Sequence, residues 1–278
     1  MRTEEDSLGR IKVPKEAYYG TTTARALRNF QISGQTAPNV FREGLGLVKL
    51  AAAKTNCTLK ELDEKPAKAI MKAAEEFIEG KFNSDFKLDV LQAGAGTSYN
   101  MNANEIIANR ANELLKAPKG SYAYVHPNNH VNMAQSTNDV MPTATRIAIL
   151  LSLPELLKSI GLTESSLEKI AKKYAKLIKV GRTHNQDAVP ITLGQEFDSY
   201  AEALRKSREF IEERSIDLQT LGIGGTAVGT GINAHPKYQS LMIKILSLLT
   251  GVEFKAGKNL TELANNMNAF MNFSSSLK

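Results

Sequence analysis

Apolar residues recur at helical spacing along most of this chain of 278 residues. One stripe consists of Leu167, Ile170, Ala171, Tyr174, Leu177 and Ile178, a second of Phe197, Tyr200, Ala201, Leu204 and Ile211, and a third of Leu260, Leu263, Ala264, Met267, Phe270, Met271 and Leu277. These spacings are typical of amphipathic helices, and we expect earlier helices over residues 41–57, 66–79 and 102–115. The extended stretches, 11–13 and 122–125, are short. The pattern predicts a mainly α fold.

The length of the chain favours two domains, because a single domain mostly holds about 100–200 residues. Before residue 134 the predicted helices are short and are joined by turn-rich links such as residues 116–120. After it the helices lengthen and the loops shorten, which is typical of a bundle. We therefore predict a small N-terminal helical domain over residues 1–134 and a central domain of long bundled helices over residues 135–278.

Lysine and arginine outnumber aspartate and glutamate by 35 to 29, which gives a net charge of +6. A basic chain raises the question of nucleic-acid binding. The lysines are interleaved with apolar positions, however, as in Lys169, Lys172, Lys173, Lys176 and Lys179. Such spacing is the pattern of a solvated helix face. We expect no nucleic-acid partner, and a general positive potential suits a dianionic substrate.

The single cysteine, Cys57, excludes an internal disulfide and fits a reducing compartment. No apolar run follows the charged N-terminus, so the pattern of a secretory signal is missing. No stretch reaches the roughly 18 uncharged apolar residues of a membrane span. We expect a cytoplasmic protein without a membrane partner.

Three polar stretches interrupt the helical pattern: residues 94–102, 128–139 and 181–187. They are too rich in Gly, Ser, Thr and Asn for helix interiors, yet each adjoins a predicted helix. The first precedes a helix, and the second has Pro142 placed for a first helical turn. The third follows a helix that we expect to end near Val180.

Helix N-termini expose unpaired N–H groups and partial positive charge, which attract carboxylates. Ser and Thr hydroxyls add donors, and a histidine such as His184 can donate to a carboxylate or polarise it. If the three stretches converge, they form a dicarboxylate site. The alternative is structural: Ser136 and Asn138 only cap helices, and Gly94 and Gly96 only turn the chain.

Two other kinds of site find no support in the sequence. No Cys/His cluster has the spacing of metal ligands. Gly94-x-Gly96 lacks the rest of a dinucleotide-binding motif. We expect neither a metal nor a cofactor.

Several motifs together resemble those of the fumarase/aspartase superfamily of lyases. They are residues 89–98 with 100–105, the run 132–139, the segment 181–197 (GRTHNQDAVPITLGQEF), the opening 2–9 with Pro14, Tyr19 and Gly20, and the glycine-rich segment 224–233. The matches are collinear and cover the whole chain. The resemblance implies a mainly α, fumarase/aspartase-like fold and elimination from a succinate-type acid without a cofactor.

Within that superfamily, the stretch Gln92-Ala93-Gly94-Ala95-Gly96-Thr97-Ser98 looks like aspartate ammonia-lyases, because class II fumarases usually carry a serine where Ala95 stands. The resemblance thus implies anti elimination of ammonia from L-aspartate to give fumarate, through an aci-carboxylate dianion. Residues 224–226 and 125–128 are closer to class II fumarate hydratases, which act on malate and fumarate, so that activity is the main alternative. Asn129 stands where an Asp is more usual, which puts a secondary dicarboxylate site in doubt.

The resemblance also implies residue roles. Thr97, Ser98, Ser136, Thr137, Asn138, Thr183 and His184 correspond to substrate-binding positions. His184 would polarise a substrate carboxylate, and Thr183 and His184 would complete the site from another subunit. Family members are tetramers, so we expect a homotetramer for the complete protein.

One departure is large. The family's mobile Gly-Ser-Ser loop with its serine base, and the Met-Pro-Lys-Asn segment after it, have no counterpart before Lys278. No serine of this chain is assigned as the base. We expect a fold that is incomplete at its C-terminal end, and a chain that is inactive by itself. A hypothesis of another class follows: a non-catalytic fragment or subunit that only binds a dicarboxylate.

Overall fold

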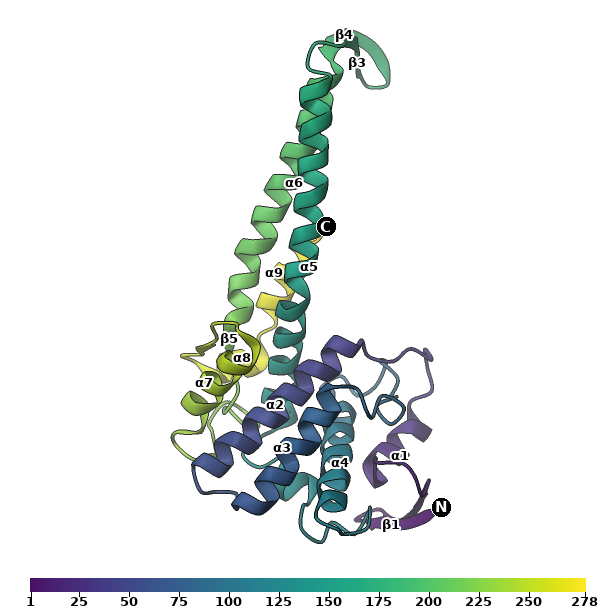
Figure 1. Ribbon diagram of the computed structural model, residues 1–278, viewed down its shortest axis with the longest axis vertical. Helices are drawn as coiled ribbons and strands as arrows, with labels where there is room; N and C mark the ends of the chain where they lie inside the picture. The colour runs from purple at the N-terminus through teal and green to yellow at the C-terminus, as the bar shows by residue number, and fades with distance from the viewer. The chain divides into compact units, whose positions relative to one another are not determined.

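The computed structural model describes all residues, 1–278, and the fold is mainly α (Figure 1). The chain divides into two compact units. The first unit contains Met1–Leu151 and Gln219–Asn266, and the second contains Ser152–Leu218 and Met267–Lys278. Helix α5 (Thr137–Lys173) begins in the first unit and ends in the second.

The first unit holds most of the buried core. Its elements are strands β1 (Arg2–Asp6) and β2 (Gly9–Val13), helices α1 (Thr21–Asn29), α2 (Asn39–Thr58), α3 (Glu64–Ile78) and α4 (Thr97–Leu114), the π-helical turn η1 (Pro127–Val131), the start of α5, strand β5 (Thr220–Leu221), helix α7 (Tyr238–Thr250), strand β6 (Lys255–Ala256) and helix α8 (Leu260–Asn265). Strands β1 and β2 pair antiparallel, and β5 and β6 pair parallel.

Helix α2 is central to this unit because glycines let two helices approach it closely. A Cβ at Gly44 would lie 2.6 Å from the carbonyl oxygen of Ala144 on α5. A Cβ at Gly46 would lie 2.6 Å from Ile78 on α3. Leu45 and Val48 of the same helix are fully buried. Side chains at the two glycine positions would force the helices apart.

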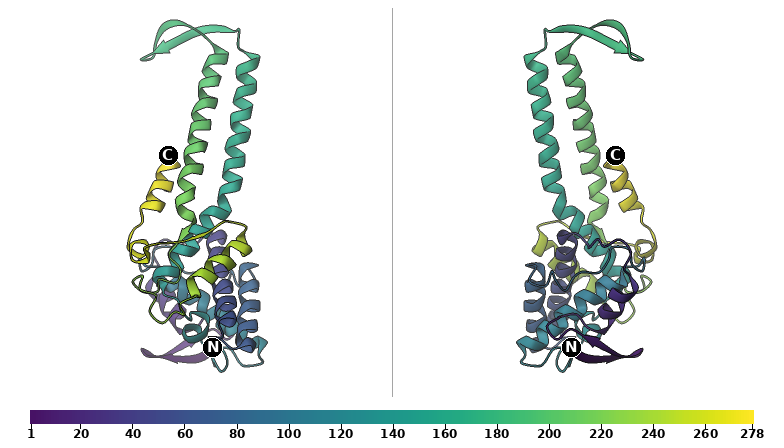
Figure 2. Two further views of the ribbon diagram at one scale, coloured as in Figure 1. Left: turned by 90° about the vertical axis from the view of Figure 1, so that its left-hand side faces the viewer. Right: turned by 90° about the vertical axis from the view of Figure 1, so that its right-hand side faces the viewer.

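The second unit consists of the later part of α5, strands β3 (Ile178–Thr183) and β4 (Gln186–Thr192), helix α6 (Leu193–Ser215), the 3₁₀ turn η2 (Ile216–Gln219) and helix α9 (Asn268–Ser276). Helices α5 and α6 lie side by side and are joined by the β3–β4 hairpin (Figure 2). Thr192 caps α6 by accepting from the N–H of Gln195, whose side chain accepts from Thr192 in return. This reciprocal cap fixes where α6 starts.

The helix predicted to end near Val180 is wrong over its last turns, because α5 ends at Lys173. The β-branched residues Ile178 and Val180 pair with β4 instead. Packing explains the early stop. A Cβ at Gly194 would lie 2.5 Å from the carbonyl oxygen of Ala171, so the start of α6 presses on the last turn of α5.

The C-terminal apolar stripe is not one helix. Asn266 adopts extended backbone angles (φ −100°, ψ 126°) between α8 and α9, and these helices belong to different units. Asparagine breaks helices readily, since its side chain competes for backbone hydrogen bonds. Residues 11–13 are extended as predicted, within β2. Residues 122–125 form no strand, and Tyr122 has a positive φ of 49°.

By length and composition alone, α5 could cross a membrane, with a mean hydropathy of 1.4 over its most apolar window. Its Arg146 is 2% exposed and donates from Nε to the carbonyl oxygen of Thr220 at 3.1 Å. Val140, Ala144 and Ile147 are fully buried in the first unit. We therefore interpret this part of α5 as a core helix of the first unit.

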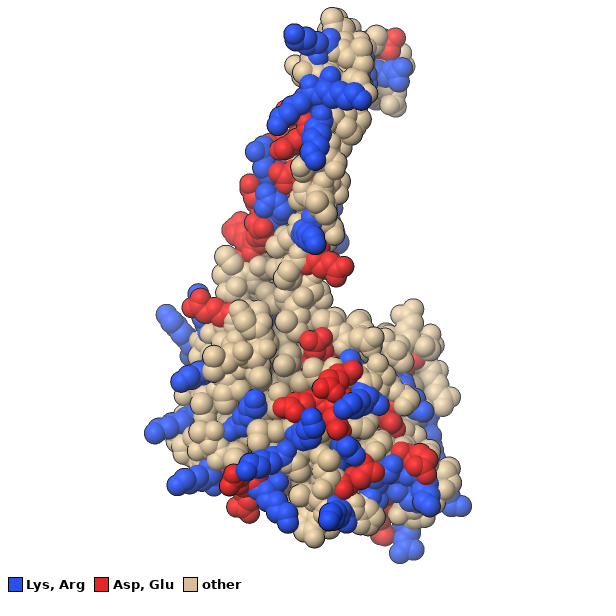
Figure 3. Space-filling view, in the orientation of Figure 1, with Lys and Arg blue, Asp and Glu red and all other residues tan.

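Charged side chains of both signs are interleaved over the face shown in Figure 3. That distribution agrees with solvated helix faces and not with a single basic surface. The predicted boundary near residue 134 falls in the turn before α5, inside the first compact unit. As a division into domains, it stays a prediction.

Candidate functional site at two helix N-termini

The first polar stretch is helical from Thr97 onward, so α4 starts earlier than predicted. Gly96 precedes the helix in the left-handed conformation (φ +75°), which glycine adopts without strain. Thr97 is exposed, and Ser98 is buried at 9% exposure. The stretch tolerates a helix because its asparagines bond to other segments. Asn100, in the first turns of α4, is an example described below.

The second polar stretch leads into α5, which begins at Thr137, a turn before Pro142. Ser136 precedes the helix, and its Oγ accepts from the N–H of Asn138 at 3.2 Å. Asp139 accepts from the N–H of Ser136 at 2.9 Å. The hydroxyl of Ser136 thus works as a helix cap, as the structural alternative stated. Thr137 and Asn138 follow it in the first turn.

These two helix starts lie against each other. A Cβ at Gly96 would lie 2.4 Å from Cε of Met141, in the first turns of α5. Asn100 Nδ2 donates to Thr137 Oγ1 at 3.2 Å. Five of the predicted residues, Thr97, Ser98, Ser136, Thr137 and Asn138, therefore come from two neighbouring helix N-termini of one unit.

The glycine-rich segment 224–233 is attached to the same place. The Oδ2 atom of Asp139 accepts from the N–H groups of Gly224 at 3.1 Å and Thr226 at 3.0 Å. The Nδ2 atom of Asn138 donates to the carbonyl oxygen of Ala227 at 2.7 Å. Burial raises the pKa of Asp139 to about 6, although its backbone N–H partners and the charge of Lys49 lower that pKa. The segment therefore depends on the first turn of α5 for its position.

Our sequence analysis missed Lys49 of α2. Its side chain is fully buried, and its Nζ atom donates to Asn100 Oδ1 (2.7 Å), Asn132 Oδ1 (3.0 Å) and Gln135 Oε1 (2.9 Å). Burial lowers the pKa of Lys49 to about 7, and the charge of Asp139 opposes that shift. One sequence signal exists: Lys49 is a lone charge inside the apolar run 45–53. A charge there is costly unless it is hydrogen-bonded.

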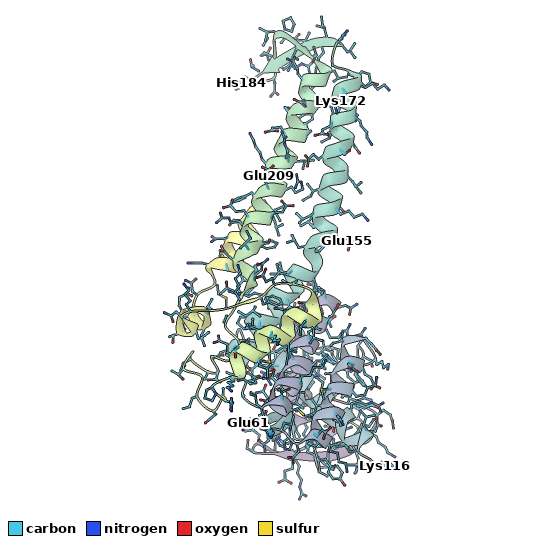
Figure 4. The ribbon with its side chains drawn as sticks, turned by 60° about the vertical axis from the view of Figure 1, so that its left-hand side comes forward. Glu61, Lys116, Glu155, Lys172, His184 and Glu209 are labelled. Atoms are coloured by element: carbon cyan, nitrogen blue, oxygen red, sulfur yellow. The ribbon has the colours of Figure 1, made fainter.

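Thr183 and His184 belong to the second unit and lie at the tip of the β3–β4 hairpin, where Figure 4 labels His184. Thr183 pairs with Gln186, which leaves a two-residue turn of His184 and Asn185. Both turn residues have positive φ (48° and 61°), as a type I′ turn requires. Both predicted side chains are exposed. The third polar stretch is thus a hairpin and not a loop after a helix.

An open cleft with a volume of about 930 Å³ runs along the first unit beside α4. Ser98, Arg25, Arg28, His126 and Asn128 contribute to its lining. The Nδ1 atom of His126 accepts from the backbone N–H groups of Asn128 at 3.2 Å and Asn129 at 3.3 Å, at the start of η1. Of the predicted residues, only Ser98 lines this cleft.

The arrangement suits a carboxylate. Two helix N-termini, the hydroxyl of Thr97 and the hydroxyl of Thr137 offer donors within one unit. No group of three His, Cys, Asp or Glu residues is placed to hold a metal ion. Donors of this kind stabilise negative charge that develops on a carboxylate during a reaction.

Comparison with known proteins gives a consistent result. A family model described as "Lyase" matches residues 9–278. An aspartate ammonia-lyase of a Bacillus species is 45% identical over all of this chain and 59% of its own length. A class II fumarate hydratase of Neisseria meningitidis is 42% identical over all of this chain and 60% of its own length.

The crystal structure of fumarate lyase:delta crystallin from Brucella melitensis, bound to cobalt, superposes with a TM-score of 0.96 at 46% identity. That match covers 99% of this chain and 60% of the solved one. The chain thus spans about three fifths of the length of the relatives it matches. Together with the motifs around both helix starts, these matches show that the chain belongs to the fumarase/aspartase superfamily of lyases.

Proposed function

We propose that the protein is an aspartate ammonia-lyase, which removes ammonia from L-aspartate to give fumarate. The observation that carries the proposal is the junction of α4 and α5, where Asn100 joins the two helix N-termini through Thr137. A succinate-type substrate carries two carboxylates, and helix N-termini with free hydroxyls bind carboxylates without a metal.

The chemistry needs a site that favours an aci-carboxylate dianion over the carboxylate it forms from. Removing the Cβ proton of aspartate places a second negative charge on the adjacent carboxylate, and ammonia then leaves from Cα. Preorganised donors lower the barrier because they meet that charge without reorganising. In this proposal Thr97, Ser136 and Thr137 hold carboxylate oxygens, and Ser98 and Asn138 contact the substrate.

Thr183 and His184 have a separate place in the proposal. They are exposed at the tip of a hairpin, where a second copy of the chain can reach them. We propose that they complete the site of another subunit, with His184 polarising the carboxylate, in a homotetramer of the complete protein. The proposal assigns binding and polarisation to this chain's residues and assigns the proton-abstracting base to none of them.

The choice of L-aspartate rests on residues 92–98. Ala95 presents a methyl group, exposed in the turn before α4, where class II fumarases usually carry a serine. Aspartate ammonia-lyases from Bacillus and Pseudomonas species are among the relatives of this chain, at 43–45% identity. Class II fumarate hydratase is the second candidate, favoured by residues 224–226 and 125–128 and by relatives at 42–47% identity.

Turnover tests the proposal. The protein is expressed from its complete reading frame, including whatever the gene encodes after Lys278, and fumarate absorbance is followed with L-aspartate or L-malate. We expect fumarate and an equal amount of ammonia from L-aspartate, and no fumarate from L-malate. Turnover of L-malate alone would make the protein a fumarate hydratase. Binding of succinate without turnover of either acid would make it a non-catalytic dicarboxylate-binding subunit.

A further inference from the structure

Lys49 is buried without a carboxylate bonded to it. Its three hydrogen bonds go to neutral amide oxygens, those of Asn100, Asn132 and Gln135. The carboxylate of Asp139 attracts the charge, but its own oxygens accept from backbone N–H groups. A buried ammonium is costly, and an apolar side chain of equal length would fill the same space. The position therefore calls for an explanation other than packing.

The amides around Lys49 are all turned the same way. Protonated Lys49 donates and cannot accept, so in this form of the protein each amide presents its oxygen to the ammonium group. The NH₂ groups consequently face outward. That of Gln135 donates to the carbonyl oxygens of Val131 and Met133, and that of Asn132 donates to the carbonyl oxygen of Gln135. These bonds hold the turn before α5 in one conformation.

The amide of Asn100 carries this orientation into the candidate site. Because Asn100 Oδ1 accepts from Lys49 at 2.7 Å, its Nδ2 is turned away from the ammonium group. This Nδ2 donates to Asn132 Oδ1 and to Thr137 Oγ1, each at 3.2 Å. An oxygen that accepts this bond directs its own O–H away from the amide. No hydrogen bond in the structure has the Thr137 hydroxyl as its donor. The residue is half-buried, so a ligand can reach this hydroxyl.

We propose that Lys49 is a positioning residue for the lyase site: by fixing the amide of Asn100, it directs the hydroxyl proton of Thr137 toward the substrate carboxylate. The inference rests on the proposed function, since it supposes that Thr137 binds a carboxylate. Lys49 itself touches no substrate. A fixed donor stabilises developing negative charge better than a hydroxyl that rotates freely.

The test is a set of double-mutant cycles in the protein expressed from its complete reading frame. Lys49→Met removes the ammonium group that donates to Asn100, and Asn100→Leu removes the amide that lies between Lys49 and Thr137. Each is measured alone and combined with Thr137→Ala, which has no hydroxyl to direct. Lys54→Met, on the same helix, is the matched control. The measured quantities are kcat, KM and the fumarate formed from L-aspartate, with urea unfolding as a check on folding.

We expect Lys49→Met and Asn100→Leu each to lower kcat/KM by about 10-fold or more. In the Thr137→Ala background neither should lower it further, because interacting residues give non-additive effects. Lys54→Met should leave kcat/KM unchanged in both backgrounds. A role limited to holding the fold would lower kcat/KM equally in both backgrounds, and that result overturns the inference. If Lys49→Met does not fold, the Asn100→Leu cycle decides.

Failure of the proposed function is visible separately in the same experiment. If the unsubstituted protein forms no fumarate from L-aspartate or L-malate, the proposed function falls and the inference falls with it. Normal turnover with additive losses overturns the inference alone.

Discussion

Asp139 Oδ2 accepts the backbone N–H of Thr226 at 3.0 Å, and this bond joins the first turn of α5 to the glycine-rich segment 224–233. The same carboxylate also accepts from Ser136 and Gly224, so one buried side chain satisfies backbone groups of both segments. It is 4% exposed. A buried acceptor of several N–H groups stabilises a fold mainly because those groups cannot form hydrogen bonds with water instead.

We predict that Asp139→Asn destabilises the protein by about 2–4 kcal/mol at neutral pH. The amide NH₂ of the substituted residue would face N–H donors and leave at least one of them unpaired. Urea unfolding followed by circular dichroism measures the loss. Asp187→Asn, at an exposed position of β4, is the control and should leave the unfolding midpoint unchanged. Equal midpoints for both variants would contradict the role of Asp139.

The stability of the protein should depend on the titration of Lys49. Burial lowers its pKa from 10.5 to about 7, so between these two values the unfolded chain holds a proton that the folded protein has released. The free energy of unfolding therefore rises with pH in this window, by up to about 1.4 kcal/mol per pH unit. Relative to Lys49→Met, the native protein should gain stability from pH 7 to pH 9. Parallel curves for the two proteins would count against a buried, titrating Lys49.

His184 can be tested apart from the turn it occupies. His184→Ala should cost about 2–4 kcal/mol of transition-state stabilisation if the imidazole polarises the substrate carboxylate. Alanine is also strained at the positive φ of this position, whereas asparagine adopts it readily. His184→Asn keeps the turn and loses the imidazole, so we expect it to lose as much kcat/KM as His184→Ala. Recovery of activity in His184→Asn would show that only the turn matters.

The helices of the first unit could be predicted from the sequence because local periodicity and burial agree there. The predicted ranges 41–57 and 66–79 fall within one or two residues of α2 and α3. The prediction failed at Ile178 and Val180, whose spacing continues the helical stripe of α5. Their strand conformation depends on pairing with Thr192 and Pro190 of β4, respectively, which local spacing does not report.

The candidate site divides in the same way. The motifs placed Thr97, Ser136 and Thr137 in polar stretches that adjoin helix starts, since Gly, Ser and Thr mark such positions locally, although α4 begins earlier than predicted. They did not reveal Lys49, which lies 51 residues before Asn100 in the chain and meets it only in the folded protein. A buried cation and its acceptors come together only in the folded chain. In the sequence, the one sign of them is a single lysine inside an apolar run.

The central claim is that Thr137, at the junction of α4 and α5, binds a substrate carboxylate. Its most direct test is calorimetric titration of the protein, expressed from its complete reading frame, with succinate, which cannot react. Thr137→Val removes the hydroxyl at constant shape, and Thr145→Val, whose hydroxyl bonds to the Met141 carbonyl on the same helix, is the control. We predict that Thr137→Val raises the Kd for succinate by about 10-fold or more, while Thr145→Val leaves it unchanged. Equal Kd values for Thr137→Val and the unsubstituted protein would contradict the account.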